Sequence, residues 1–319
     1  MKGFVFSFAV TVSLASSTAM AADMAVKVPP PAPATSPWDF AITGALMSDY
    51  NFRGITQSNH QPSVQFGLEP RYNFSKELQG YVGASGESID FPNRAAAEID
   101  LYGGIRPTID KLALDFGAWY YLYPDGQCFN TVALCNSLGG GPSVAAALPN
   151  GNTVKQNLSF LEFYGKATYT VNDNFNFGGS IWGSPVLGNG MAGVLDSGAY
   201  GIYYAGNVTL TAPSTWLPNG IGASVSADVG YWQLGTTDAF YLNTPLPSYW
   251  NWDAGLAFTW KIFTLDLRYY QTNLTKAQCD VFTSDQTATP NALGVLQSNW
   301  CGAAFVAKLS IATALSALK

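Results

Sequence analysis

Residues 248–274 read SYWNWDAGLAFTWKIFTLDLRYYQTNL and contain two runs in which apolar and polar side chains alternate. The apolar positions extend from Trp252 to Trp260 in the first run and from Phe263 to Tyr269 in the second. A period of two predicts two strands, each with one apolar and one polar face. Because a two-residue link separates the runs, we expect a tight hairpin whose apolar faces coincide.

A hairpin with one apolar and one polar face fits either a membrane barrel or a soluble β-sandwich. Trp252 and Trp260 lie about eight residues apart, which at roughly 3.3 Å per residue and a 45° tilt approximates the apolar band of an outer-membrane barrel. The opposite face carries Asp253, Asp266 and Arg268, which suit a wet lumen. The alternative is a soluble sandwich, in which the apolar face packs against a second sheet.

The composition favours the membrane barrel. Charged residues make up 11% of the 319 residues and aromatic residues 14%, whereas a soluble domain carries about 25% charged residues. No run of about twenty apolar residues follows the N-terminus, so we expect no membrane-spanning helix in the mature chain. The net charge of −6 excludes a basic surface for nucleic acid, so no nucleic-acid partner is expected.

The first residues have the features of a secretory signal. Lys2 precedes an apolar run, and Ala19-Met20-Ala21 fits the small-x-small pattern of a cleavage site. We therefore divide the chain into a signal peptide (1–21), a Pro-rich periplasmic leader (22–37) and an outer-membrane β-barrel (38–319). A secretory signal before barrel-like strands predicts the outer membrane of a Gram-negative cell.

Cleavage after Ala21 would leave Ala22-Asp23 at the start of the leader. That start resembles barrels of some alphaproteobacteria in which an Ala-Asp terminus is linked covalently to peptidoglycan. The resemblance implies peptidoglycan as a partner through the N-terminus. The alternative is a plain disordered leader, since a Pro-rich segment cannot pair into a sheet.

The four cysteines, Cys128, Cys135, Cys279 and Cys301, would reach an oxidising compartment. Four cysteines allow three pairings. Short loops favour Cys128–Cys135 with Cys279–Cys301, and the alternative is that some remain reduced. The chain has no CxxC pair, so we expect no zinc site.

The period-two pattern recurs along the mature chain. Besides the hairpin it predicts strands at residues 38–53, 63–74, 79–91, 97–109, 112–123, 158–171, 175–186, 199–211, 221–234 and 300–315. The links between these strands alternate between short and long, as the turns and loops of outer-membrane barrels do. We therefore predict an all-β fold, a transmembrane antiparallel up-and-down β-barrel of about twelve strands. The long Cys-bearing loop at 124–157 could fold into the pore or cap it.

Most charged residues occupy the same alternate positions as the other polar residues of these strands. They are therefore predicted to point inward and line the pore. They are Asp49, Arg53, Glu69, Arg71, Glu87, Glu98, Asp100, Arg106, Asp115, Glu162, Lys166, Asp228, Asp253, Asp266 and Arg268, with Asp39 and Lys308 on the same parity. An Arg or Lys facing lipid at mid-depth costs about 2–4 kcal/mol, which favours inward positions. We expect Asp49 to pair with Arg53 and Asp266 with Arg268. The alternative is that these side chains form only structural ion pairs.

Two motifs resemble a known family. The stretch SDYNFRGITQS at 48–58 and the stretch EIDLYGG at 98–104 are similar to motifs of the TorF-type porin family. An aromatic YYLYP edge at 120–124 precedes a large loop, as in that family. The resemblance implies an outer-membrane barrel that acts as a porin, and it is strongest over residues 41–124.

No sequence feature indicates catalysis or a cofactor. His60 is the single histidine, and it lies in a short loop with Ser58 and Asp49 nearby in the sequence. A barrel hydrolase would need such a histidine as general base, but we expect a surface-loop histidine and no enzyme. Gly139-Gly140-Gly141-Pro142 does not lie between a strand and a helix, so it is no phosphate-binding loop.

The polar inner parity predicts a passive diffusion channel for small hydrophilic solutes or ions, weakly preferring cations. The alternative from another class is a closed structural or adhesive barrel that works through its extracellular loops. Either barrel would contact outer-membrane lipid and lipopolysaccharide and would be inserted by the barrel-assembly machinery.

Overall fold

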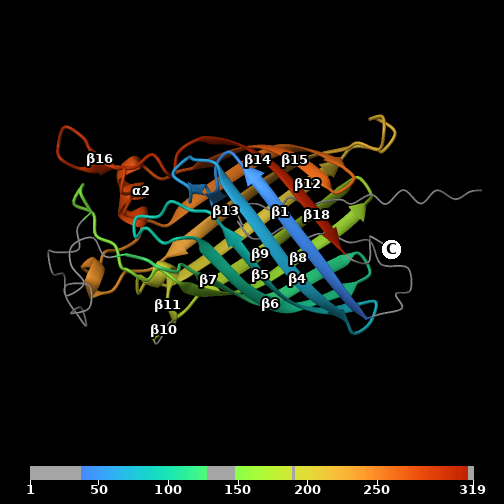
Figure 1. Cartoon of the computed structure of the whole chain (residues 1–319), viewed down its shortest axis with the longest axis horizontal. Helices are drawn as coiled ribbons and strands as arrows, with labels where there is room; N and C mark the ends of the chain where they lie inside the picture. Colours follow the sequence, from blue (N-terminus) through green and yellow to red (C-terminus); the bar gives the residue numbers. More distant parts are fainter. Residues whose placement is uncertain (1–36, 128–147, 189–190, 315–319) are drawn as a thin grey trace, which may run out of the picture.

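Twelve antiparallel strands close into a barrel in the computed structural model, which describes residues 37–127, 148–188 and 191–314 (Figure 1). Each strand pairs with its neighbours along the chain, and β1 pairs with β18 to close the ring. The barrel strands are β1 (Trp38–Met47), β4 (Ser63–Asn73), β5 (Leu78–Glu87), β6 (Glu98–Ile109), β7 (Leu112–Leu122), β8 (Phe160–Asn172), β9 (Phe175–Ser184), β12 (Gly201–Thr211), β13 (Gly222–Leu234), β14 (Tyr249–Trp260), β15 (Phe263–Thr272) and β18 (Ala304–Ala314). The predicted fold class is confirmed.

Side chains along each strand alternate between the barrel interior and its outer face. In β4, Ser63 and Gln65 are buried, whereas Val64 and Phe66 are each 55% exposed. Since successive side chains of a strand point to opposite faces, one period-two pattern separates the polar interior from the apolar exterior. The apolar residues that this pattern leaves exposed therefore form the outer wall.

The hairpin at 248–274 forms β14 and β15 as predicted. Trp260 pairs with Phe263 across the two-residue turn, so the apolar faces of both strands coincide. Trp252 is 45% exposed on the outer face, whereas Asp253 is buried inside. Lys261, the first of the two turn residues, adopts a positive φ of 57°, which is common in two-residue hairpin turns.

Two sets of links join the barrel strands, one set at each end of the barrel. The predicted alternation of short and long links fails at 212–221, which is ten residues long, the same length as 88–97. Residues 74–77, 110–111, 173–174, 212–221 and 261–262 form one set, and residues 48–62, 88–97, 123–159, 185–200, 235–248 and 273–303 form the other. The second set carries small elements: β10 (Val186–Gly188), β11 (Met191–Ala192), η1 (Val194–Asp196), η2 (Ala239–Tyr241), α2 (Lys276–Thr283), β16 (Thr289–Pro290) and β17 (Leu296–Gln297). Figure 1 shows α2 and β16 beyond one mouth of the barrel.

The predicted first strand at 38–53 is wrong in its second half. Strand β1 ends at Met47, and the chain then forms two very short strands, β2 (Asn51–Phe52) and β3 (Ile55–Thr56). The alternation of apolar and polar residues continues through both halves, so the pattern does not reveal where the wall strand ends. Arg53-Gly54 forms the turn between β2 and β3, and both residues have positive φ, 51° and 80°.

Several predictions concern residues outside the described ranges. The signal peptide (1–21), nearly all of the leader (22–37), and Cys128 and Cys135 lie there. Within the described ranges, Cys279 and Cys301 form a disulfide, as predicted. None of the helices in the described residues is long and apolar enough to span a membrane.

Candidate functional site: the barrel interior and its inward hairpin

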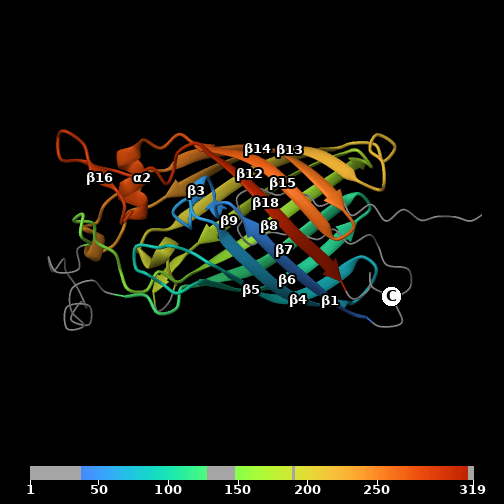
Figure 2. The same ribbon diagram turned by 45° about the horizontal axis from the view of Figure 1, so that its top comes forward.

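The link between β1 and β4 folds into the barrel. We call β2, the Arg53-Gly54 turn and β3 the inward hairpin. Its tip contacts side chains of β8, β9, β12, β13 and β14. In the order of strands around the barrel, these lie across the ring from β1 and β4. Figure 2 places β3 at the end of the barrel that carries α2.

Arg53 at the tip forms a two-point ion pair with Glu162 of β8. Its Nη1 and Nη2 donate to Oε1 and Oε2 of Glu162 at 3.0 and 2.7 Å. Both side chains have no exposed surface. Ser184 and Tyr121 also donate to this carboxylate, at 3.1 Å each. A buried pair is favourable only when such additional hydrogen bonds satisfy it, and here the wall strands supply them.

Aromatic rings surround the same guanidinium group. Its Cζ lies 4.2 Å from the ring centroids of Tyr203 and Trp232 and 4.6 Å from that of Phe52. Cation–π attraction is strongest at desolvated sites of this kind. The hydroxyl of Tyr249 donates to the backbone oxygen of Arg53 at 3.0 Å. Strands β8, β12, β13 and β14 thus hold one residue of the inward hairpin.

Gly54 allows this close approach. A Cβ at Gly54 would collide with the Thr272 side chain and lie 3.1 Å from Cβ of Asn251. Its φ of 80° also lies in the left-handed region that glycine adopts at little cost. Both requirements, conformation and space, select glycine beside Arg53.

A hydrogen-bonded group closes the base of the inward hairpin. Asp49 accepts from Ser58 Oγ at 3.0 Å and from Thr56 Oγ1, and it lies 2.8 Å from Nδ1 of His60. Nε2 of His60 lies 3.2 Å from the backbone oxygen of Asn299 in the last long loop. The hydrogen bond to Asp49 raises the pKa of His60 above its ordinary 6.5. The hydroxyl of Ser58 donates to Asp49 and not to His60. Ser58 and His60 therefore do not have the contact of a nucleophile with its general base.

An arginine-rich cluster lies on the inner faces of β4, β6 and β7. Arg106 donates from Nη1 and Nη2 to Glu69 at 2.7 and 3.0 Å, and from Nε to Asp115 at 3.2 Å. Arg71 also donates to Glu69. The guanidinium of Arg106 stacks 3.6 Å from the ring of Tyr81. The predicted inward charges thus compensate one another across neighbouring strands.

A second cluster lies on the inner faces of β13, β14 and β15. Arg268 donates to Asp266 at 3.0 and 3.1 Å and to Asp253, and it lies 3.6 Å from Asp228. The predicted pair of Asp266 with Arg268 is therefore confirmed. The predicted pair of Asp49 with Arg53 is wrong, because Arg53 turns away to Glu162.

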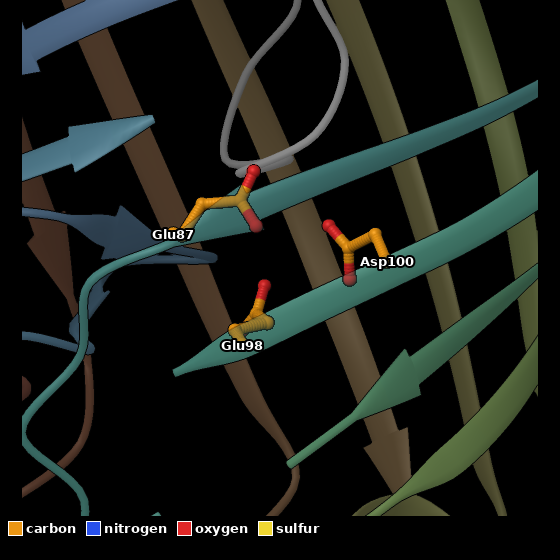
Figure 3. Close-up of side chains that lie close together, drawn as sticks. All are labelled: Glu87, Glu98 and Asp100. Atoms are coloured by element: carbon orange, nitrogen blue, oxygen red, sulfur yellow. The ribbon is translucent and has the colours of Figure 1, made fainter. Parts of the chain in front are cut away.

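Three carboxylates gather on β5 and β6 near the inward hairpin. Figure 3 shows Glu87, Glu98 and Asp100 pointing toward a common space, and one oxygen from each lies within 4.8 Å of those of the other two. Tyr50 of the link donates to Glu98 at 2.6 Å, and Tyr123 donates to it at 2.9 Å. The two stretches that resemble one porin family, 48–58 and 98–104, are thus in direct contact.

The structure places the predicted pore-lining residues as follows. All of them except Asp49 and Arg53 lie on the inward parity of barrel strands, including Lys166, whose Nζ lies 4.6 Å from the Tyr164 ring. Asp49 and Arg53 belong to the inward link instead.

Sequence reasoning missed the aromatic residues of the interior: Trp119, Tyr121, Phe160, Trp182, Tyr203, Trp232 and Tyr249. The signal that could have found them is parity. Trp119 shares the parity of Asp115, and Trp232 shares that of Asp228. Of the tryptophans, only Trp252 and Trp260 were interpreted by their face in the sequence, and both lie on the outer face.

Comparison with solved structures finds proteins of bacterial outer membranes. The NanC porin is 8% identical, with 86% of this chain and 98% of that chain covered and a TM-score of 0.40. OprB of Pseudomonas putida is 10% identical, with 87% and 94% covered and a TM-score of 0.38. An outer membrane channel from Pseudomonas putida is 8% identical, with 90% and 98% covered and a TM-score of 0.40. Similarity at this level says nothing about function.

No protein of curated function matches this sequence. A family model does match, over residues 31–298, which is most of the chain. Its members are described as bacterial proteins of unknown function. The chain therefore belongs to the Gcw_chp family.

Proposed function

We propose that the protein is an outer-membrane channel through which small hydrophilic solutes or ions diffuse, with a weak preference for cations. The observation that carries this proposal is the contrast between the two faces of the closed barrel. Charged residues such as Glu69, Arg106 and Arg268 lie inside, whereas Val64, Phe66 and Leu101 are exposed outside. Lipid on one side and water on the other account for such a contrast.

Exposed aromatic residues near both ends of the barrel support the membrane setting. Trp38, Phe74, Trp260 and Phe263 lie near the short turns, and Trp250, Trp252 and Phe305 lie near the long loops. Aromatic girdles of this kind flank the apolar band of outer-membrane barrels. The similarity of residues 48–58 and 98–104 to TorF-type porins agrees with the same proposal.

The inward hairpin would set the width of the channel. Arg53 and Glu162 are fully buried beside the rings of Trp232 and Tyr203, so this level of the barrel is filled by side chains. Passage would then require the hairpin to move, or it would follow a path beside it. We propose that the inward hairpin is the constriction of the channel.

The same buried hairpin favours a second candidate, a closed barrel that works through its loops. The described parts of the long loops carry α2, a disulfide and several short strand pairs, which would give a closed barrel a structured loop surface. Twelve strands leave an interior that side chains and one hairpin can fill.

Conductance across planar bilayers tests the two candidates. We would compare the wild-type protein with a variant in which residues 51–56 are replaced by a Gly-Ser linker of equal length. The matched control replaces residues 289–294, all of them exposed in the last long loop. Channel steps that become larger only when residues 51–56 are replaced support the constricted channel. Folded protein that stays silent in all three forms would establish the closed barrel instead.

A further inference from the structure

The carboxylates Glu87, Glu98 and Asp100, which we call the carboxylate triad, form a group that the proposed channel does not explain. Glu87 and Glu98 face each other in the register of β5 and β6, and Asp100 lies two positions further along β6. Their exposed fractions are 2%, 2% and 0%. Like charges directly opposite each other on a sheet are destabilising, so this arrangement needs a compensating group.

The described residues supply no basic partner for the triad. No nitrogen of a Lys, Arg or His side chain lies within ion-pair distance of its oxygens in residues 37–127, 148–188 and 191–314. Lys308 of β18 attracts Glu87 electrostatically without forming an ion pair with it. Every other large group of inward carboxylates in the described barrel contains an arginine. Buried charges are otherwise paired or bound to a metal.

Two oxygens of the triad also lack a hydrogen-bond donor. Glu98 accepts from Tyr50 and Tyr123, Glu87 Oε1 accepts from Gln65 at 2.8 Å, and Asp100 Oδ2 accepts from Ser85 at 3.2 Å. Glu87 Oε2 and Asp100 Oδ1 are buried and accept no hydrogen bond of normal geometry from the described residues, although the side chains of Ser85 and Trp119 lie beside Glu87 and Asp100. A buried polar atom in a native protein normally has a partner. This observation is separate from the clustering of charge and indicates a missing ligand.

We propose that the carboxylate triad binds one divalent cation of the calcium type. Calcium takes oxygen ligands at about 2.3–2.6 Å, so two ligands on opposite sides of one ion lie roughly 4.6–5.2 Å apart. One oxygen from each of the three carboxylates lies within 4.8 Å of the other two, so a single ion of this size could contact all three. The donor set consists of carboxylate oxygens alone, which suits hard cations and not zinc.

The cation would also fix the seat of the inward hairpin. Glu98 accepts from Tyr50, so an ion that holds the Glu98 carboxylate also positions the acceptor of this hydrogen bond. The three carboxylates carry three negative charges and the ion two positive ones, so one negative charge remains. The positive charge of Lys308 attracts Glu87 and offsets part of it. The proposal stands apart from transport, since a closed barrel would use the same ion.

Terbium luminescence tests the site on the purified, detergent-solubilised full-length protein after treatment with EDTA. Terbium replaces calcium, and the Tyr50 and Tyr123 rings beside Glu98 are close enough to sensitise its emission. We expect one terbium to bind and calcium to displace it. Glu87→Gln and Asp100→Asn should each weaken binding at least tenfold. The control is Glu77→Gln, because Glu77 is an exposed carboxylate in the short link between β4 and β5, and it should leave binding unchanged.

Thermal unfolding gives a second readout that does not depend on terbium. Calcium should raise the unfolding temperature of the wild type above that in EDTA, and it should have no effect on the Glu87→Gln variant. Equal binding by wild type and both triad variants would overturn the proposal. So would an unfolding temperature at pH 8 that is the same in calcium and in EDTA, because protons would then neutralise the triad. Both measurements are made without a conductance assay, so they are independent of the outcome for the channel.

Discussion

Arg53 donates to both carboxylate oxygens of Glu162, at 3.0 and 2.7 Å, although 109 residues separate the two. The contact joins the link after β1 to β8 across the barrel interior. Because both side chains are fully buried, neither charge can be solvated when the other is removed. The inward hairpin is therefore part of the same packed unit as the barrel wall, and its displacement requires several wall contacts to break together.

Replacing Arg53 by Met should strongly destabilise the protein. The change leaves Glu162 buried without its cation, and loss of one partner of a buried pair costs about 3–5 kcal/mol. Adding Glu162→Gln should recover part of that loss, since the orphaned charge is then gone. Urea unfolding in detergent measures both effects. The control is Lys76→Met at an exposed turn position, and a loss as small as that of the control would contradict the role of the pair.

Gly54→Ala should loosen the inward hairpin. The added Cβ would need a positive φ and would collide with Thr272. Gly220→Ala is a matched control, because Gly220 has a φ of 71° but nothing within 4 Å of its added Cβ. Both variants should lose the roughly 1–2 kcal/mol of a left-handed non-glycine residue, and only Gly54→Ala should lose more and change conductance. Equal unfolding temperatures for the two variants would show that space at Gly54 is unimportant.

The stability of the hairpin base should fall as pH rises. Both ring nitrogens of His60 face acceptors, Asp49 and the Asn299 backbone oxygen, so the protonated ring satisfies both contacts. The hydrogen bond to Asp49 raises the pKa of His60 from 6.5, with Asp285 adding a smaller attraction. Stabilisation from a raised pKa is fully present below about 6.5 and disappears as pH rises through the folded-state value.

The single histidine makes this prediction easy to measure. Its imidazole proton resonance should titrate with a midpoint above 6.5, in protein purified without a histidine tag. The unfolding temperature of the wild type should fall between pH 6 and pH 8.5 more steeply than that of His60→Gln. Because the His60 side chain is 38% exposed, solvent screening keeps this effect modest. A midpoint at or below 6.5 would refute the assignment.

The disulfide between Cys279 of α2 and Cys301 should stabilise the last long loop. It closes a loop with a sequence separation of 22, for which chain entropy predicts about 3 kcal/mol. The Cys279→Ser/Cys301→Ser variant should keep the barrel, since β15 and β18 pair independently, but residues 273–303 should become sensitive to protease. Non-reducing peptide mapping should recover the Cys279–Cys301 link. The predicted Cys128–Cys135 link stays a prediction, and a peptide joining Cys128 to Cys279 would exclude the pairing.

Any current through the barrel should prefer cations weakly. Carboxylates outnumber basic groups among the inward positions, and low-dielectric walls focus their field on passing ions. The arginine clusters around Glu69 and Asp253 compensate much of this charge, and salt screens the remainder. The reversal potential under a KCl gradient measures the preference, which should be largest in dilute salt. A clear anion preference would contradict the assignment of these residues to the pore.

Local pattern was sufficient for the wall of the barrel. In β14 and β15 the alternation from Trp252 to Tyr269 fixes which face meets the interior, because a strand has a period of two regardless of its partners. The same parity placed Glu69, Arg106 and Arg268 inside, and the succession of predicted strands agrees with their order around the barrel. These properties depend on residues close in the chain or on strand geometry alone.

The course of residues 48–62 and the partners of the charged side chains depended on the tertiary structure. Asp49 and Arg53 would lie on the same face of one continuous strand. In the structure, however, Asp49 contacts His60 and Arg53 pairs with Glu162. The same alternating pattern can extend a wall strand or turn inward, and Gly54 permits the turn without fixing its direction. What selects the inward turn is the space left by Gly54 and the rings and carboxylate of strands that lie over a hundred residues away. Closure of the barrel brings those groups together. A pattern of neighbouring residues cannot predict contacts between groups so far apart in the sequence.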